Sequence, residues 1–291
     1  MTTRSITAYD AQQTAAVAFR VKVTKTVLYA VLITLAVFML LPFFWMLSAS
    51  LKLDKDVFVF PIQWIPAVPQ WSNFETIWTR IPFLTFFGNT FKLTTIITLL
   101  QLATSSFAAY AFAKLEFWGR DTLFLAYIAS IAIPWQVYMV PQFIMMRQMG
   151  LVNNHMSLIL LQAFTAFGVF LLRQFFISIP DEILDAARID GMSEYGIYFR
   201  IMLPLSKPAL ATLTIFSAVF VWNDFMGPLI YLTRTELKTI QLGLRMFIQQ
   251  YAADYALIMA AALVSLIPVI ILFLAFQRFF VEGIGTTGIK G

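Results

Sequence analysis

Five carboxylates crowd one short segment of this chain, between two long apolar stretches. They are Asp181, Glu182, Asp185, Asp190 and Glu194, and the residues between them are mostly small or apolar. This composition predicts a short acidic helix that is held at both ends. Such a helix suits contact with a soluble partner, because its charges stay in water while its ends are fixed. The alternative is an amphipathic loop on the membrane surface, although helices that lie on lipid are usually basic.

Local signals divide the segment into two helices. Pro180 and Asp181 suit a helix start, because proline fits the first positions and aspartate caps free amides. Ala187 lies four positions after Ile183 and three after Leu184, so we expect the three to share an apolar face. The small side chains of Ala186 and Ala187 would let a partner's backbone approach closely. Gly191 permits a turn, and Ser193 can cap a second helix over 194–200 that ends towards Leu203 and Pro204.

A second candidate site surrounds Asp224. The run Trp222-Asn223-Asp224, followed by Gly227-Pro228, predicts an unwound or kinked stretch inside an apolar segment. An ionisable residue at membrane depth is a functional candidate by default. Freed backbone groups there must face protein or a wet cavity. A sugar would suit this place, and a structural kink near the outer interface is the competing interpretation.

Two further aromatic positions are weaker candidates. Trp135 and Gln136 follow Pro134, which predicts a second kinked, polar patch, and Tyr255 stands at the entry to the last apolar run. Anchoring at the membrane interface explains each of them more simply than ligand contact. Trp135, Gln136 and Tyr255, together with Trp222, Asn223 and Asp224, are the candidate residues for a translocation pathway through the membrane.

Several kinds of chemistry are excluded by composition. The chain has no cysteine and a single histidine, so disulfides, thiolate metal sites and histidine clusters are excluded. It has no phosphate loop of the G-x-x-x-x-G-K-[ST] type, so we expect no ATPase activity. An intramembrane enzyme would need paired acids or a His-Glu-x-x-His helix, and neither is present. Ion-coupled secondary transport would favour several intramembrane carboxylates or matching interrupted helices, so one Asp224 argues against it. We expect no metal, cofactor or nucleic acid to bind this chain.

The elements that carry these residues are membrane helices. Of 291 residues, 60% are hydrophobic and 12% charged, against about 25% charged in soluble domains. Each crossing needs about 20 apolar residues. The sequence therefore predicts an all-α polytopic membrane protein with six transmembrane helices, near 27–47, 88–113, 121–146, 156–178, 206–232 and 255–278. The acidic segment, 180–204, falls between the fourth and fifth. The first apolar run is too long for a secretory signal.

The distribution of Lys and Arg predicts the orientation. With the N-terminus inside, inner segments hold twelve Lys and Arg residues and outer segments eight. Arg20, Lys22 and Lys25 precede the first helix, which usually dominates orientation. We therefore expect 1–26 and 281–291 to be cytoplasmic, on either side of a membrane domain at 27–280. The outer loop 52–84 is rich in proline and tryptophan, which indicates interfacial anchoring or contact with an extracellular partner.

One motif in the acidic segment resembles a known family. The run Asp185-Ala186-Ala187-Arg188-Ile189-Asp190-Gly191, followed at the expected distance by Ile201-Met202-Leu203-Pro204, is similar to the "EAA" loop of permease subunits in binding-protein-dependent ABC importers. Two positions depart from the usual pattern. Asp185 replaces a glutamate, which keeps the charge and shortens its reach, and Met192 stands where alanine is common.

Other segments resemble the carbohydrate branch of that family, the maltose-type permeases. They are the first outer loop (Ser50-Leu51-Lys52, Phe58–Pro61, Trp64-Ile65-Pro66, Asn73-Phe74), the Trp222–Phe225 motif and the C-terminal Gly288-Ile289-Lys290-Gly291. The resemblance covers the chain from Lys22 onward.

The resemblance implies a non-catalytic, pathway-forming subunit in a bacterial cell membrane. Its partners would be a second, similar permease, two cytoplasmic ATPases that bind ATP and Mg²⁺, membrane lipid, and an extracellular solute-binding protein, lipid-anchored or periplasmic, that delivers a sugar. It implies ATPase contacts for Asp181, Glu182, Leu184, Asp185, Ala186, Ala187, Asp190, Gly191, Leu203 and Pro204, and for the tail residues Gly288, Lys290 and Gly291. A secondary transporter or a permease for a non-sugar solute remains the alternative.

Overall fold

The fold is helical throughout the part of the chain that the computed structural model describes, residues 3–248 and 254–287. Four helical stretches are long and apolar enough to cross a membrane: Phe19–Ser50, Phe83–Lys114, His155–Ile177 and Tyr255–Phe279. Two further pairs of helices qualify only as bent units, with bends of 97° and 77°. The described chain therefore offers four spans, or up to six if each bent pair is one span.

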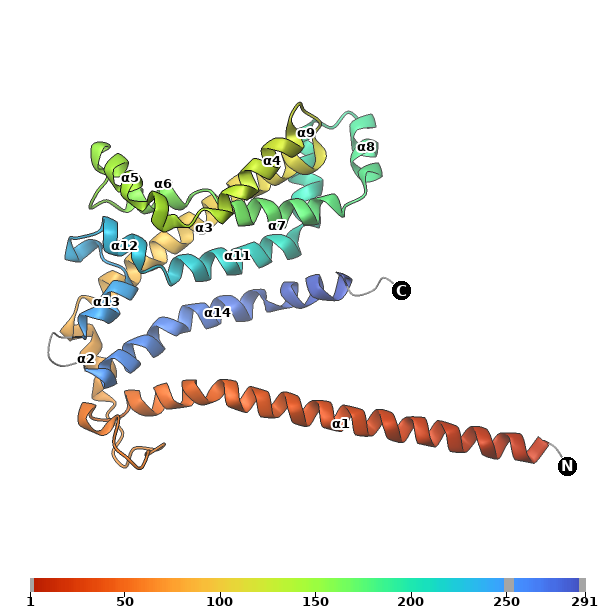
Figure 1. Cartoon of the computed structure of the whole chain (residues 1–291), viewed down its shortest axis with the longest axis horizontal. Coiled ribbons are helices and arrows are strands. Elements are labelled where there is room, and N and C mark those ends of the chain that lie inside the picture. Colours follow the sequence, from red (N-terminus) through yellow and green to blue (C-terminus); the bar gives the residue numbers. More distant parts are fainter. Residues whose placement is uncertain (1–2, 249–253, 288–291) are drawn as a thin grey trace.

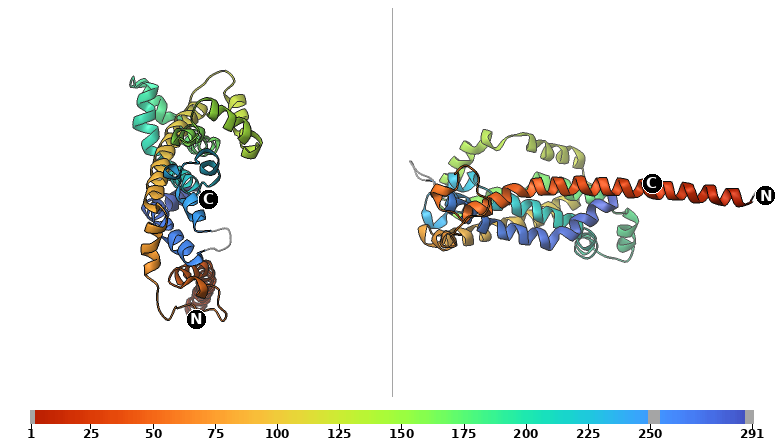
Figure 2. Two further views of the ribbon diagram at one scale, coloured as in Figure 1. Left: turned by 90° about the vertical axis from the view of Figure 1, so that its left-hand side faces the viewer. Right: turned by 90° about the horizontal axis from the view of Figure 1, so that it is seen from below.

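The first helix is much longer than the sequence predicts. Helix α1 runs from Thr3 to Ser50 without a break, so the predicted segment 1–26, from Thr3 on, and the predicted span 27–47 form one helix. The prediction followed the charges at Arg20, Lys22 and Lys25, but charge does not stop a helix. No glycine or proline occurs between Thr3 and Leu41. At about 1.5 Å per residue, the 48 residues reach roughly 70 Å, and α1 extends well beyond the other helices (Figure 2).

Helix α3, Phe83–Lys114, is the centre of the bundle. It packs against α7 (Ala166–Ile177) and α11 (Lys207–Trp222), while α11 also packs against α14 (Tyr255–Thr287) and α14 against α1. These helices lie side by side along the long axis of the molecule (Figure 1). The contact with α7 is close because a Cβ at Gly168 would lie 2.5 Å from Ser105 Oγ. Small residues thus let two helices approach, as in other membrane bundles.

The predicted third span is sharply bent. Helix α4 (Arg120–Ala129) continues through a short turn to Ala132 and meets α5 (Trp135–Gln148) at 97°. Pro134 lies at the bend in an extended conformation and has no amide hydrogen to continue a helix. The sequence predicted a kink after Pro134 within the span 121–146, and the bend lies at that position.

The predicted fourth span is interrupted near its middle. Helix α6 (His155–Gln162) ends before α7 begins, which frees backbone carbonyl groups. Polar side chains of α3 satisfy two of them. Gln101 Nε2 donates to the Gln162 carbonyl at 2.7 Å, and Thr104 Oγ1 donates to the Ala163 carbonyl at 2.8 Å. Such partners are what allow a break at membrane depth.

The predicted fifth span is divided twice. A bend of 77° at Ser206 precedes α11, which ends at Trp222; α12 follows over Met226–Tyr231. The break that the sequence predicted after Trp222, within the span 206–232, is confirmed. Pro208 lies in the first turn of α11 and Pro228 in the first turn of α12, where the missing amide hydrogens cost little.

A cap of short elements covers the end of the bundle opposite α8. It contains the loop after α1, α2 (Ser72–Arg80) and α13 (Ile240–Met246). The Asn73 side chain donates to the carbonyls of Ser50 and Lys52, both at 2.9 Å. Asp54 Oδ1 accepts the Tyr255 amide at 2.6 Å and so caps α14 from a distant loop. Capping by a distant loop ties this end together.

Three features lie at the same end of the molecule in Figure 1: the start of α1, the end of α14 and α8 (Asp181–Ile189). Helix α14 continues to Thr287, so the predicted tail over 281–291 is helical in its first part. Gly288, Lys290 and Gly291 lie outside the described residues.

Candidate functional site

The acidic segment folds as two short helices around a tight turn. Helix α8 ends at Ile189, and Gly191 follows with φ of +80°, a left-handed conformation that suits glycine. The Gly191 amide donates to the Arg188 carbonyl at 3.0 Å. Ser193 then caps α9 (Glu194–Ile197), with the Gly196 amide 3.3 Å from its Oγ. The turn and both predicted helix starts are confirmed.

The apolar face of α8 points inwards. Leu184 and Ala187 are buried in a core with residues of α3, α7 and α11, whereas Ile183 is exposed. The expectation that the three share one face is therefore wrong, and Ala187 is buried away from the close partner contact that the sequence suggested. The side chains open to a partner are instead Ile189, 86% exposed, and Tyr195, 73% exposed. The spacing of apolar residues along a helix predicts which of them are neighbours, but it does not say whether they face the core or the surface.

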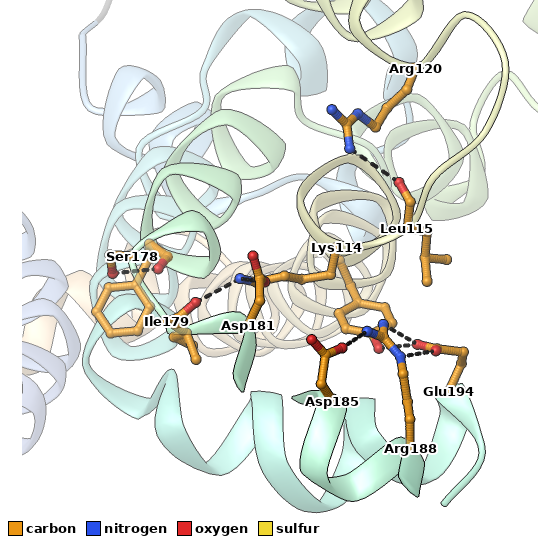
Figure 3. Close-up of polar contacts among 11 residues, drawn as sticks. Lys114, Leu115, Arg120, Ser178, Ile179, Asp181, Asp185, Arg188 and Glu194 are labelled. Atoms are coloured by element: carbon orange, nitrogen blue, oxygen red, sulfur yellow. Dashed lines mark hydrogen bonds and ion pairs between the residues drawn. The ribbon is translucent and has the colours of Figure 1, made fainter. Parts of the chain in front are cut away.

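One lysine and one arginine form ion pairs with three of the five acids (Figure 3). Lys114 Nζ lies 2.6 Å from Asp181 Oδ1, and Arg188 bonds Asp185 Oδ1 and Glu194 Oε1, each at 2.8 Å. The hydrogen bond from Arg188 lowers the pKa of the Glu194 carboxyl below its usual value. Glu182 and Asp190 are exposed and form no ion pair within the described residues. They remain open to a cationic partner surface.

The second helix continues through a widened turn. Residues Tyr198–Met202 form a π-helical turn, and α10 (Leu203–Leu205) follows. Pro204 cannot donate an amide hydrogen to the carbonyl one turn earlier, which favours the wider turn. Leu203 packs against the core that holds Leu184, while Pro204 is exposed. Leu203 therefore positions the segment, and Pro204 belongs to its surface.

A cavity of about 790 Å³ lies deeper, between α5, α6, α11 and α12. Its polar lining comes mainly from glutamines, and its apolar lining from aromatic rings. The lining includes Gln101, Trp135, Gln136, Tyr138, Gln142, Gln162, Phe164, Phe167, Phe216, Phe220, Asp224 and Tyr231. Its one carboxylate is Asp224, and no Lys, Arg or His lines it among the described residues.

Asp224 sits in the break between α11 and α12. Its Oδ2 accepts from Gln162 Nε2 at 2.8 Å, and its Oδ1 accepts the Gly227 amide at 3.1 Å. It therefore caps α12 and joins it to α6. A Cβ at Gly227 would lie 2.5 Å from Asp224 Oδ2, so only glycine fits there without displacement.

The structure separates the six pathway candidates. Trp135, Gln136 and Asp224 line the cavity. Trp222 is buried and donates from Nε1 to the Ser265 carbonyl at 3.1 Å, and Asn223 accepts from Gln241 at 3.2 Å. Tyr255 packs edge-on against Phe58 in the cap. These last three are not cavity residues.

Three other glutamines of the cavity were not among the residues predicted from the sequence. Gln101, Gln142 and Gln162 come from three different helices, and Trp135 Nε1 donates to Gln142 Oε1 at 2.9 Å. A signal did exist, because a glutamine inside an apolar run needs a partner at membrane depth. Their convergence depends on tertiary contacts, which spacing along the chain does not encode.

A helical membrane protein with a polar central cavity and an acidic helix pair at one end has the features of a transport subunit. Residues 101–285 match the family described as "binding-protein-dependent transport system inner membrane component". The chain belongs to this family.

Curated relatives cover most of the chain. The arabinooligosaccharides transport system permease protein AraQ of Halalkalibacterium halodurans is 37% identical over 78% of this chain and 81% of its own. The melibiose/raffinose/stachyose import permease protein MelC of Bacillus subtilis is 35% identical over 86% and 91%. A solved bacterial ABC transporter that imports the acidic polysaccharide alginate matches with a TM-score of 0.79, at 26% identity, over 89% of this chain and 97% of that one.

Proposed function

We propose that this chain forms one half of the pathway of an ATP-driven sugar importer, with a second, similar permease subunit as the other half. The observation that carries this proposal is the cavity, with its glutamine amides and aromatic rings. Sugar hydroxyls pair with amides, while the apolar faces of sugar rings stack on aromatic side chains. Relatives that are named for arabinooligosaccharides and for melibiose, raffinose and stachyose support this cargo class.

The cargo we propose is a neutral saccharide. An anionic sugar would meet Asp224 without a lysine, arginine or histidine in the described lining to offset its charge. Like charges repel strongly where water is scarce. This chain would therefore differ from the alginate importer in cargo charge while sharing its fold.

Energy would come from two separate cytoplasmic ATPases that hold ATP and Mg²⁺. The acidic helix pair would seat on them through exposed Ile189, Asp190 and Tyr195, with Glu182 and Asp190 available for cationic side chains. ATP can shift the pathway between two states only through contacts that differ between those states. This segment is where we place such contacts.

We further propose six spans, with α4 and α5 together as the third and α11 and α12 together as the fifth, and cytoplasmic termini in a bacterial cell membrane. The position of α8 at the same end as the start of α1 and the end of α14 supports this orientation. The capped opposite end would receive the solute-binding protein, lipid-anchored or periplasmic.

Reconstituted importer in vesicles tests the proposal. We expect uptake of neutral oligosaccharides that requires ATP and the binding protein, with little uptake of uronate oligosaccharides. Trp135→Ala should reduce uptake, whereas Trp118→Ala, 97% exposed in the loop after α3, should not. Uptake that persists without ATP and follows a proton gradient would instead support a secondary transporter.

A further inference from the structure

Three polar residues form a stripe along the end of α3 that faces the acidic segment. Ser106, Tyr110 and Lys114 are four positions apart, so they lie on one side of the helix. Each bonds to a different part of the segment between Ile179 and Tyr198. The three hydrogen-bonding side chains therefore attach α3 to the acidic segment at three separate points.

Lys114 holds the start of α8. Its side chain is only 3% exposed, and Nζ donates to the Ile179 carbonyl and to Asp181 Oδ1, both at 2.6 Å. A buried ammonium needs such partners, because an unpaired charge away from water is costly. The joint between α7 and α8 is therefore tied to α3.

Tyr110 holds the middle of the segment. Its Oη donates to Glu194 Oε2 at 2.5 Å, and Glu194 in turn pairs with Arg188 of α8 (Figure 3). The ion pair spans the Gly191 turn, so a single tyrosine on α3 is linked to both short helices. Hydrogen bonds to charged groups are among the stronger ones in proteins.

Ser106 holds the far end. Its Oγ lies 2.6 Å from Tyr198 Oη, and the Tyr198 ring stacks on Phe107 with centroids 4.4 Å apart. Tyr198 begins the π-helical turn that leads into α11. The same helix α3 reaches the cavity through Gln101 and Thr104, which bond the break between α6 and α7.

We propose that Ser106, Tyr110 and Lys114 are positioning residues that make α3 move with the acidic segment and so carry its displacement to the cavity. This inference rests on the proposed function, because it assigns a route to the coupling. The covalent connections alone would transmit motion loosely, since Pro180 interrupts one and the 77° bend at Ser206 the other. The three attachments brace both joints against α3.

The experiment uses the complete importer in vesicles and measures cargo imported per ATP hydrolysed. Tyr110→Phe and Glu194→Gln should each lower this ratio by about tenfold, the usual effect of losing one strong hydrogen bond. The double variant should be no worse than either single one. Lys114→Met should also lower the ratio, and Lys114→Arg should restore most of it. Tyr127→Phe is the matched control, because Tyr127 packs against the same core without a hydroxyl partner in the described structure.

A distance measurement provides a second, independent readout. The chain has no native cysteine, so it carries labels only at Glu116→Cys and Ile183→Cys, which are both exposed. We expect their separation to stay within about 2 Å between nucleotide-free and ATP-trapped states, as for packed elements that move together.

Normal cargo per ATP in Tyr110→Phe and Glu194→Gln would overturn the inference, as would a change of about 5 Å, one helical turn, between the labels. Either result leaves the proposed function intact as long as wild-type uptake needs ATP. Absence of ATP-driven uptake by wild-type importer would instead remove the proposed function itself.

Discussion

At the scale of single residues, Asp224 and Arg188 are charged groups that are held by specific partners. Asp224 shares its two carboxylate oxygens between Gln162 and the Gly227 amide. Arg188 bridges Asp185 and Glu194 beside the Gly191 turn. Each group stabilises a place where the backbone departs from a regular helix, so small changes there should have specific consequences.

Gly227→Ala should destabilise the pathway without disturbing the acidic segment. The added methyl would lie 2.5 Å from Asp224 Oδ2, and relieving that overlap costs about 1–3 kcal/mol. Gly88→Ala is the control, because a Cβ there meets nothing within 4 Å. The midpoint temperature of thermal unfolding and the rate of uptake should both fall in Gly227→Ala and stay unchanged in Gly88→Ala. Equal behaviour of the two would contradict the described packing.

Glu194 should make stability depend on pH in a defined direction. Hydrogen bonding from Arg188 lowers its pKa in the folded protein, so the stabilisation is fully present above the unfolded value of about 4.3. It is lost as pH falls through the lowered folded value. Because both side chains are partly exposed, we expect roughly 0.5 kcal/mol after screening.

The measurement is the unfolding midpoint of wild type and Glu194→Gln across this pH range. Wild type should be the more stable of the two at neutral pH and lose that advantage in acid. A constant difference down to the lowest pH would show that the ion pair does not contribute.

At the scale of elements, long apolar runs are predictable and their breaks only partly so. The helix Phe83–Lys114 lies close to the predicted 88–113 because no proline or strong polar cluster interrupts it. Pro134 predicts the bend before α5, and the Trp222–Pro228 run predicts the break between α11 and α12. The end of α6 at Gln162 carries no such local signal, since its carbonyl partners Gln101 and Thr104 come from another helix.

Gly191→Pro should uncouple transport while leaving the protein in the membrane. Proline cannot adopt a φ of +80°, and its ring would remove the amide that bonds the Arg188 carbonyl. The turn between α8 and α9 would open, although the spans would remain. We expect uptake to fall by at least about tenfold while assembly, measured by co-purification, stays near normal.

Gly150→Ala is the matched control for backbone strain. Gly150 has φ of +69° and lies between α5 and α6, away from the acidic segment. The Gly150→Ala substitution should lower the free energy of unfolding by about 1 kcal/mol and leave the amount of cargo imported per ATP unchanged. Normal uptake in Gly191→Pro would count against any role for the turn.

At the scale of the whole molecule, the acidic segment and the cavity occupy different levels of one bundle, joined by α3. Composition was enough to predict a helical membrane protein, and the spacing of Asp185, Gly191 and Pro204 was enough to locate the segment. The inward face of Leu184 and Ala187 and the Tyr110–Glu194 bond could not be predicted, because each depends on residues far along the chain. The convergence of the cavity glutamines is of the same kind.

In the proposed function, the surface around Ile189 seats on an ATP-hydrolysing protein. Since the chain lacks cysteine, a photo-crosslinker at Ile189→Cys or Asp190→Cys reports one position each, and Ala187→Cys, buried, is the control. In native membrane vesicles we expect the first two to capture an ATPase and the third to capture far less, with yields that change when ATP is trapped. If Ile189→Cys and Asp190→Cys capture no ATP-hydrolysing protein while uptake is active, this surface is not the ATPase seat.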